Sequence, residues 1–171
     1  CGELGDLGQG SFTIALEHAQ SGVRCAWEVS EWVNESSQII RMMDYLKATG
    51  GRMVGFNNLG FDYPVLHLLY RMRTADAATL YAKAQAIIAS QELNRFQHQV
   101  YPSDRVVEQI DLFKIHHFDN MARSTSLKLL EFNMRLASVK DLPFPVGSTL
   151  TRDQVVMLKD YNMHDVHATR M

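Results

Sequence analysis

The segment MVGFNNLGFDYPVLHLLYRM, residues 53–72, decides the fold because it changes from a strand pattern to a helix pattern within a few residues. An apolar run is followed by two asparagines, a Gly-Phe-Asp-Tyr-Pro corner and a second apolar run. Pro64 falls in the first turn of the second run, where a missing N–H costs a helix little. The pattern predicts a short strand over 52–58, buried on both faces, and a helix over 63–72.

Asp62 lies at the junction between this strand and this helix. Aspartate is among the best residues for accepting the first free N–H groups of a helix, so its position alone favours an N-cap. The alternative is a chemical role at the end of a buried strand. The rest of the chain has to decide between the two.

The segments on either side alternate between strand and helix patterns. Two β-rich runs, 11–19 and 22–30, are separated by a Gln-Ser-Gly turn and predict a hairpin. Apolar residues at helical spacing over 35–51, closed by two glycines, predict a helix. Later patterns predict a helix over 76–90, a loop over 91–105, a strand over 106–115, a helix over 124–136 and a final helix over 151–171 with a Thr151/Gln154 capping box. We therefore expect one α/β domain, residues 1–171, with an antiparallel start and flanking helices.

Length and composition suit a single domain with a substantial core, since the chain has 171 residues and a mass of 19.5 kDa. A net charge of −2 argues against a basic scaffold that binds phosphate mainly by charge, but not against an enzyme. Two cysteines are too few for a disulfide framework or a zinc site, and they indicate a reducing, cytoplasmic setting. No window approaches the ~20 apolar residues of a membrane span. A start without methionine, and an end inside a helix pattern, lead us to expect a fragment.

The final helix supplies a second acid, Asp165. Tyr161 precedes it by four residues, so both side chains lie on one face of the helix, together with Leu158 and Ala168. A carboxylate in an apolar stripe is costly unless it is paired or bound to a metal ion. The other interpretation is a partly exposed aspartate next to a packed tyrosine.

Taken together, these groups resemble the motifs of the tyrosine branch of the DEDD superfamily of 3′–5′ exonucleases. That branch has a ribonuclease-H-like fold and includes proofreading domains of DNA polymerases, especially of phages. The second motif of the family, Asn-x-x-x-Phe-Asp with a proline two residues on, is matched by Asn57, Phe61, Asp62 and Pro64. The third motif, Tyr-x-x-x-Asp, is matched by Tyr161 and Asp165. IDLFKI (110–115) and STSLKLLEFNM (124–134) resemble the strand and helix between them, and the resemblance covers 11–171.

The resemblance implies a mixed sheet of the ribonuclease-H type with antiparallel N-terminal strands, and hydrolysis of the 3′-terminal phosphodiester of single-stranded DNA. Two divalent ions, Mg²⁺ or Mn²⁺, would assist that reaction. It also implies that Asp165 and Asp62 are metal ligands and that the hydroxyl of Tyr161 orients the attacking water.

For the substrate, the resemblance implies that Asn57 and Phe61 contact the terminal nucleotide, Phe61 by packing against sugar or base. Ser126 and Lys128 would contact phosphate, although a solvated helix face explains Lys128 equally well. The expected partners are a single-stranded DNA 3′ end and a DNA polymerase domain or subunit, in the host cytoplasm if the source is a phage.

The chain departs from the family at the first motif, a strand with Asp-x-Glu. Counting back from Phe12 places Leu4 at the position of the aspartate and Asp6 at that of the glutamate, and Glu3 is the other candidate acid. Either the first strand is truncated or altered, or this is a catalytically inactive module that binds nucleic acid or a polymerase partner. An exonuclease that acts on RNA is a third possibility.

Several other polar residues have structural interpretations that we favour. For Asp111 we expect a structural role at a strand end, although it could lie near the site. The pair His116–His117 is expected in a surface loop, because neighbouring side chains point in different directions. His164 and His167 flank Asp165, and we expect them on an exposed side of the final helix.

Overall fold

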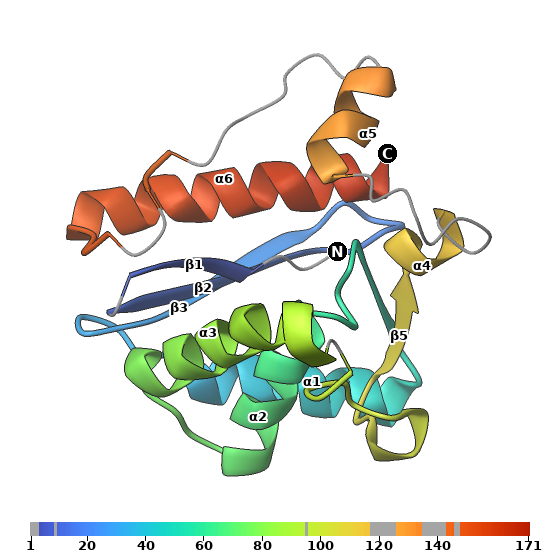
Figure 1. Cartoon of the computed structure of the whole chain (residues 1–171), viewed down its shortest axis with the longest axis horizontal. Helices are drawn as coiled ribbons and strands as arrows, with labels where there is room; N and C mark the ends of the chain where they lie inside the picture. The colour runs from blue at the N-terminus through green and yellow to red at the C-terminus, as the bar shows by residue number, and fades with distance from the viewer. Residues whose placement is uncertain (1–3, 9, 95, 117–125, 135–142, 146–147) are drawn as a thin grey trace.

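The computed structural model describes residues 4–8, 10–94, 96–116, 126–134, 143–145 and 148–171. Within these residues the chain has the predicted mixed α/β architecture, with antiparallel strands first and helices on both sides of them (Figure 1). Glu3 and His117 lie outside the described residues.

The first sheet is antiparallel and contains strands β1 (Leu4–Gly8), β2 (Ser11–Glu17) and β3 (Arg24–Ser30), in that order. The predicted hairpin is confirmed, because β2 pairs with β3 from Ser11↔Ser30 to Glu17↔Arg24. The connecting loop includes Gly22 with a φ of 71°, a left-handed conformation that glycine adopts without steric cost.

The second sheet consists of β4 (Arg52–Gly55) and β5 (Glu108–Asp111), which are parallel. The expectation of one mixed sheet is thus not met in the described part of the chain, where the strands form two sheets. The predicted strand 106–115 is also too long, since helix α4 (Leu112–His116) begins directly after β5. The carboxylate of Asp111 accepts the N–H of Phe113 at 3.1 Å, which favours a helical turn there over a continued strand.

Helices lie on both faces of the antiparallel sheet (Figure 1). One layer contains α1 (Ser36–Thr49), α2 (Asp62–Met72) and α3 (Ala77–Asn94), and the other contains α5 (Leu127–Asn133) and α6 (Arg152–Arg170). The prediction of a loop over 91–105 is wrong at its start, because α3 continues to Asn94, and a 3₁₀ turn follows at Pro102–Asp104. Among the described helices, none is both long and apolar enough to cross a bilayer.

Strand β2 separates two different interfaces, because its side chains alternate between the faces of the sheet. Phe12 and Ile14 belong to the main hydrophobic core, which they share with residues of α1, α2 and α3. Thr13 and Glu17 instead bond to α6. The strand is buried along almost its whole length because helices cover both of its faces.

Polar contacts help to attach helix α6 to the sheet. Asn162 donates to the hydroxyl of Thr13 at 2.5 Å, and Lys159 forms an ion pair with the buried Glu28 at 2.8 Å. These bonds satisfy polar groups that would otherwise be buried without partners, and they therefore fix the rotation of α6 about its axis.

Glu17 anchors the C-terminal end of α6, and its side chain is only 1% exposed. Its carboxylate accepts hydrogen bonds from Arg170 and His167 and pairs with Arg24 at 3.1 Å. Burial alone would raise the pKa of Glu17, but these hydrogen bonds and the charge of Arg24 outweigh it and hold the pKa below its usual value. A depressed pKa means that the pairing stabilises the fold above the unfolded-state pKa and is lost as the pH falls through the folded-state pKa.

We expect Glu17→Gln to lower the free energy of unfolding at pH 7 by about 2 kcal/mol, because the substitution removes a buried charge from the partly exposed Arg24 and Arg170 and weakens the hydrogen bond with His167. Urea unfolding measures this loss, and the difference from the parent should shrink as the pH falls from the unfolded-state pKa of Glu17 through its lowered folded-state pKa, because the parent carboxylate then becomes protonated. Glu31→Gln, at an exposed position, serves as the matched control and should leave the midpoint unchanged. An equal loss in both variants would contradict an anchoring role for Glu17.

Candidate metal centre

The turn between β4 and α2 is held in place by Asp111, at the end of the neighbouring strand. The N–H groups of Asn57 and Leu59 donate to the two oxygens of its carboxylate, at 2.9 and 3.1 Å. Asp111 is buried, so the predicted structural role at a strand end is the one that these bonds show. The carboxylate fixes the backbone that carries the second motif.

Asn57 adopts a left-handed conformation, with a φ of 58°, which asparagine tolerates better than most residues. Its carbonyl accepts the N–H groups of Gly60 and Phe61 at 3.0 and 3.1 Å. A Cβ atom at position 60 would lie only 2.5 Å from the side-chain oxygen of Asn57. Glycine at this position therefore leaves room for the amide group of Asn57 above the turn.

Asp62 is the first residue of α2 and is only 7% exposed. The N-cap interpretation is wrong, because Phe61 occupies the N-cap position and no side chain caps this helix end. The side chain of Asp62 instead lines a small pocket between β2, β4, β5 and α2. The other lining residues are Ile14, Met53, Val54, Asn58, Tyr63, Leu66 and Gln109.

The pocket of Asp62 is next to the strand where the first motif is expected. Ile14, one of its lining residues, pairs with Leu4 in the ladder between β1 and β2. Leu4 is the position that the family spacing assigns to the first metal-binding aspartate. Asp6, the position of the glutamate, pairs with Phe12 in the same ladder.

Helix α6 begins with the predicted capping box, in which Thr151 and Gln154 exchange hydrogen bonds. Asp165 is only 5% exposed, so the interpretation as a partly exposed aspartate is wrong. Tyr161, one turn earlier, is half-buried and packs against a small cluster formed by Leu150, Val155 and Leu158. The third motif therefore presents a buried carboxylate and a packed tyrosine from one helix face.

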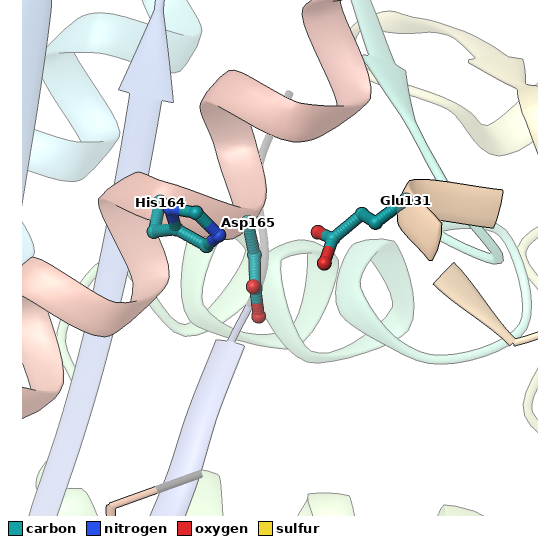
Figure 2. Close-up of side chains that lie close together, drawn as sticks. All are labelled: Glu131, His164 and Asp165. Atoms are coloured by element: carbon teal, nitrogen blue, oxygen red, sulfur yellow. The ribbon is translucent and has the colours of Figure 1, made fainter. Parts of the chain in front are cut away.

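Asp165 lies next to two further ligand-type side chains, Glu131 from α5 and His164 from α6 (Figure 2). One ligand atom from each of the three residues lies within 4.8 Å of the others. In Figure 2 the carboxylate of Glu131 points from α5 towards Asp165. We call Glu131, His164 and Asp165 the acidic–histidine cluster.

Glu131 is the most deeply buried member of this cluster, with 2% exposure. Within the described part of the chain, both of its carboxylate oxygens and Nε2 of His164 are buried and form no hydrogen bond. Burial, followed by the charge of Asp165, raises the pKa of Glu131, although His164 and Lys128 act in the opposite direction. The cluster thus concentrates negative charge that no hydrogen bond to Glu131 offsets.

Glu131 was not among the predicted site residues, although the sequence carries a signal for its burial. Glu131 follows Leu127 by four residues and therefore lies on the same helix face as an apolar side chain. Nothing local indicated that this face would meet α6. His164 was expected on an exposed side of its helix and is instead part of the cluster, whereas His167 contacts Glu17 and Arg24.

The remaining predicted site residues lie at α5 and in the turn before α2. Ser126 is exposed and caps α5 by accepting the N–H of Leu129 at 3.2 Å, and Lys128 is exposed on the same helix. Phe61 is partly buried against the main core, and Asn57 is half-buried in the turn. The acidic–histidine cluster contains Asp165 but not Asp62.

Searches of protein-family models, curated proteins and solved structures found no match to this chain.

Proposed function

We propose that this chain is a metal-dependent 3′–5′ exonuclease domain of ribonuclease-H-like fold that removes nucleotides from the 3′ end of single-stranded DNA. The observation that carries the proposal is the burial of Asp165 beside a second carboxylate, on the same helix face as Tyr161. Proteins rarely bury two neighbouring carboxylates without a cation to offset their charge. The match of Asn57, Phe61 and Asp62 to the second motif supports the proposed relationship to this exonuclease family.

The arrangement of elements is compatible with this proposal. Antiparallel N-terminal strands with flanking helices are features that the resemblance implies, whereas the single mixed sheet that it also implies is divided into two sheets in the described part of the chain. Asp62 is buried at the start of α2. The pocket that it lines also includes Ile14, the residue of β2 that pairs with Leu4 of β1. The motif positions therefore lie on elements that pack around one sheet.

Each residue would have a distinct role in the reaction. Asp165 and Asp62 would hold divalent ions, Mg²⁺ or Mn²⁺, through carboxylate oxygens, the ligand type that these ions prefer. When bound, such ions lower the pKa of the attacking water and offset the charge on the leaving 3′ oxygen. The hydroxyl of Tyr161, which can donate and accept, would orient the water, while Asn57 and Phe61 would position the terminal nucleotide.

A second candidate is a catalytically inactive module of the same fold that binds single-stranded nucleic acid or a polymerase partner. Leu4 favours it, because leucine at the position of the first aspartate removes a metal ligand. The two candidates differ in catalysis and not in fold, so an assay that records binding and cleavage separates them.

The test uses the chain itself with 5′-labelled single-stranded DNA, in Mg²⁺ or Mn²⁺, with binding measured in parallel by fluorescence anisotropy. We expect slow shortening one nucleotide at a time, which EDTA abolishes and which a 3′-phosphorylated oligonucleotide resists. Binding without shortening would support the inactive module instead. Neither binding nor shortening would contradict both candidates, and the same assay on RNA identifies the preferred sugar.

A further inference from the structure

The acidic–histidine cluster offers more ligand atoms than the exonuclease motifs account for. The motif residue in it is Asp165, whereas Glu131 and His164 have no role that the resemblance implies. Glu131 is nonetheless almost fully buried, with 2% exposure, and both of its carboxylate oxygens lack a hydrogen bond among the described residues. Its carboxylate points at Asp165 (Figure 2). The structure therefore has an unexplained polar group directed at a second acid.

A buried carboxylate without partners is costly and needs a compensating charge. The ion pairs found between two described residues reach Glu17, Glu28 and Asp44, and none of these pairs reaches Glu131. A proton shared between Glu131 and His164 would satisfy one carboxylate oxygen and Nε2 but would leave the second oxygen of Glu131 without a partner. A divalent cation satisfies all three side chains at once, because each can give one lone pair.

We infer that Glu131, His164 and Asp165 bind one divalent transition-metal ion, and that this site takes Zn²⁺ in preference to Mg²⁺. Carboxylate oxygens and imidazole nitrogen are ligand types that zinc takes, and a set of three protein ligands leaves a position open for water. Imidazole favours zinc over magnesium, which prefers oxygen ligands and retains its own waters.

The geometry allows such a site with side-chain movement alone. Atoms bound to one ion at ~2.1 Å can lie at most ~4.2 Å apart. The three ligand atoms already lie within 4.8 Å of one another, so rotations of the side chains close the remaining gap. Glu131 comes from α5 and the other two ligands from α6, and an ion would therefore also link these two helices.

The inference shares Asp165 and Glu131 with the proposed nuclease site, but it is tested separately from nuclease activity. It predicts a site that fills in the absence of nucleic acid. Zinc binding without DNA shortening would contradict the proposed function and leave this site standing. DNA shortening without zinc binding would support the proposed function and contradict the zinc site.

The experiment is isothermal titration calorimetry with Zn²⁺ alone, and then with Mg²⁺ alone, on the whole chain and on Glu131→Gln and His164→Asn. We expect one zinc per chain, Mg²⁺ binding at least ~10-fold weaker, and a loss of zinc affinity of about 10- to 100-fold in each variant. Glu131→Gln keeps the shape of the side chain and removes an unpaired buried charge, so the fold should persist, as circular dichroism would verify.

Matched controls are Glu108→Gln and His18→Asn, which change the same residue types at exposed positions. Both should bind zinc like the parent chain. Visible absorption of the Co²⁺-substituted chain provides a readout that needs no variant, since four-coordinate cobalt absorbs far more strongly than hydrated cobalt. Unchanged zinc affinity in both cluster variants, equal affinity for Mg²⁺, or loss of binding in a control variant would each overturn the inference.

Discussion

Replacing Leu4 by aspartate is expected to raise the rate of Mg²⁺-dependent shortening of single-stranded DNA by about tenfold or more, equivalent to ~1.4 kcal/mol of transition-state stabilisation. The family spacing assigns this position to the first metal-binding acid, and Leu4 pairs with Ile14, which lines the pocket of Asp62. A new carboxylate there would add the acid that the family motif has at this position. The increase is measured as initial rates with 5′-labelled DNA.

The matched control for this gain adds the same charge elsewhere. Gln20→Asp, at an exposed position in the hairpin loop, should leave the rate unchanged. Leu4→Asp combined with Asp6→Glu restores the full Asp-x-Glu pattern and should be at least as active as the single variant. If Leu4→Asp folds and binds DNA but shortens it no faster than the parent, Leu4 does not occupy the first-motif position.

Replacing Asp165 by asparagine in the Leu4→Asp background is expected to lower the shortening rate by at least ~100-fold. The substitution keeps the size of a buried side chain while removing the charge that a metal ion requires. Asp62→Asn should act in the same direction, because Asp62 would hold the other ion. The loss should appear in the maximal rate and not only in the DNA concentration needed for half of it.

The comparison for this loss is Asp160→Asn, on the same helix but exposed. Asp160→Asn should change the shortening rate by less than about twofold, because a substitution at an exposed position away from the site has little effect on the fold. Near-ultraviolet circular dichroism establishes that both variants fold. A rate in Asp165→Asn equal to that in Asp160→Asn would remove Asp165 from the active site and with it the proposed function.

Features that depend on neighbouring residues could be predicted from the sequence. The hairpin of β2 and β3 follows from two β-rich runs around Gly22, and α1 ends at a left-handed Gly50 where two glycines close the apolar pattern. The Thr151/Gln154 capping box lies within one turn of α6. Caps and turns are visible in a sequence because the bonding groups are at most a few positions apart.

Features that depend on contacts between distant segments could not be predicted in this way. The predicted end of β5 was wrong. The carboxylate of Asp111 accepts hydrogen bonds both from the turn at Asn57 and from Phe113 in the first turn of α4. Asp62 was compatible with an N-cap until the fold placed Phe61 there. In each case the outcome depends on how segments far apart in the sequence pack together, which no local pattern indicates.

The sequence by itself determined the order of the elements from β2 to α6, apart from α4, and the motif residues of α2 and α6, since periodicity, caps and motif spacing are local properties. The tertiary structure alone decided that Glu131 is buried beside Asp165 and that His164 belongs to the same cluster. The physical reason is that burial and charge pairing depend on which helix faces meet, and α5 and α6 meet only in the folded chain.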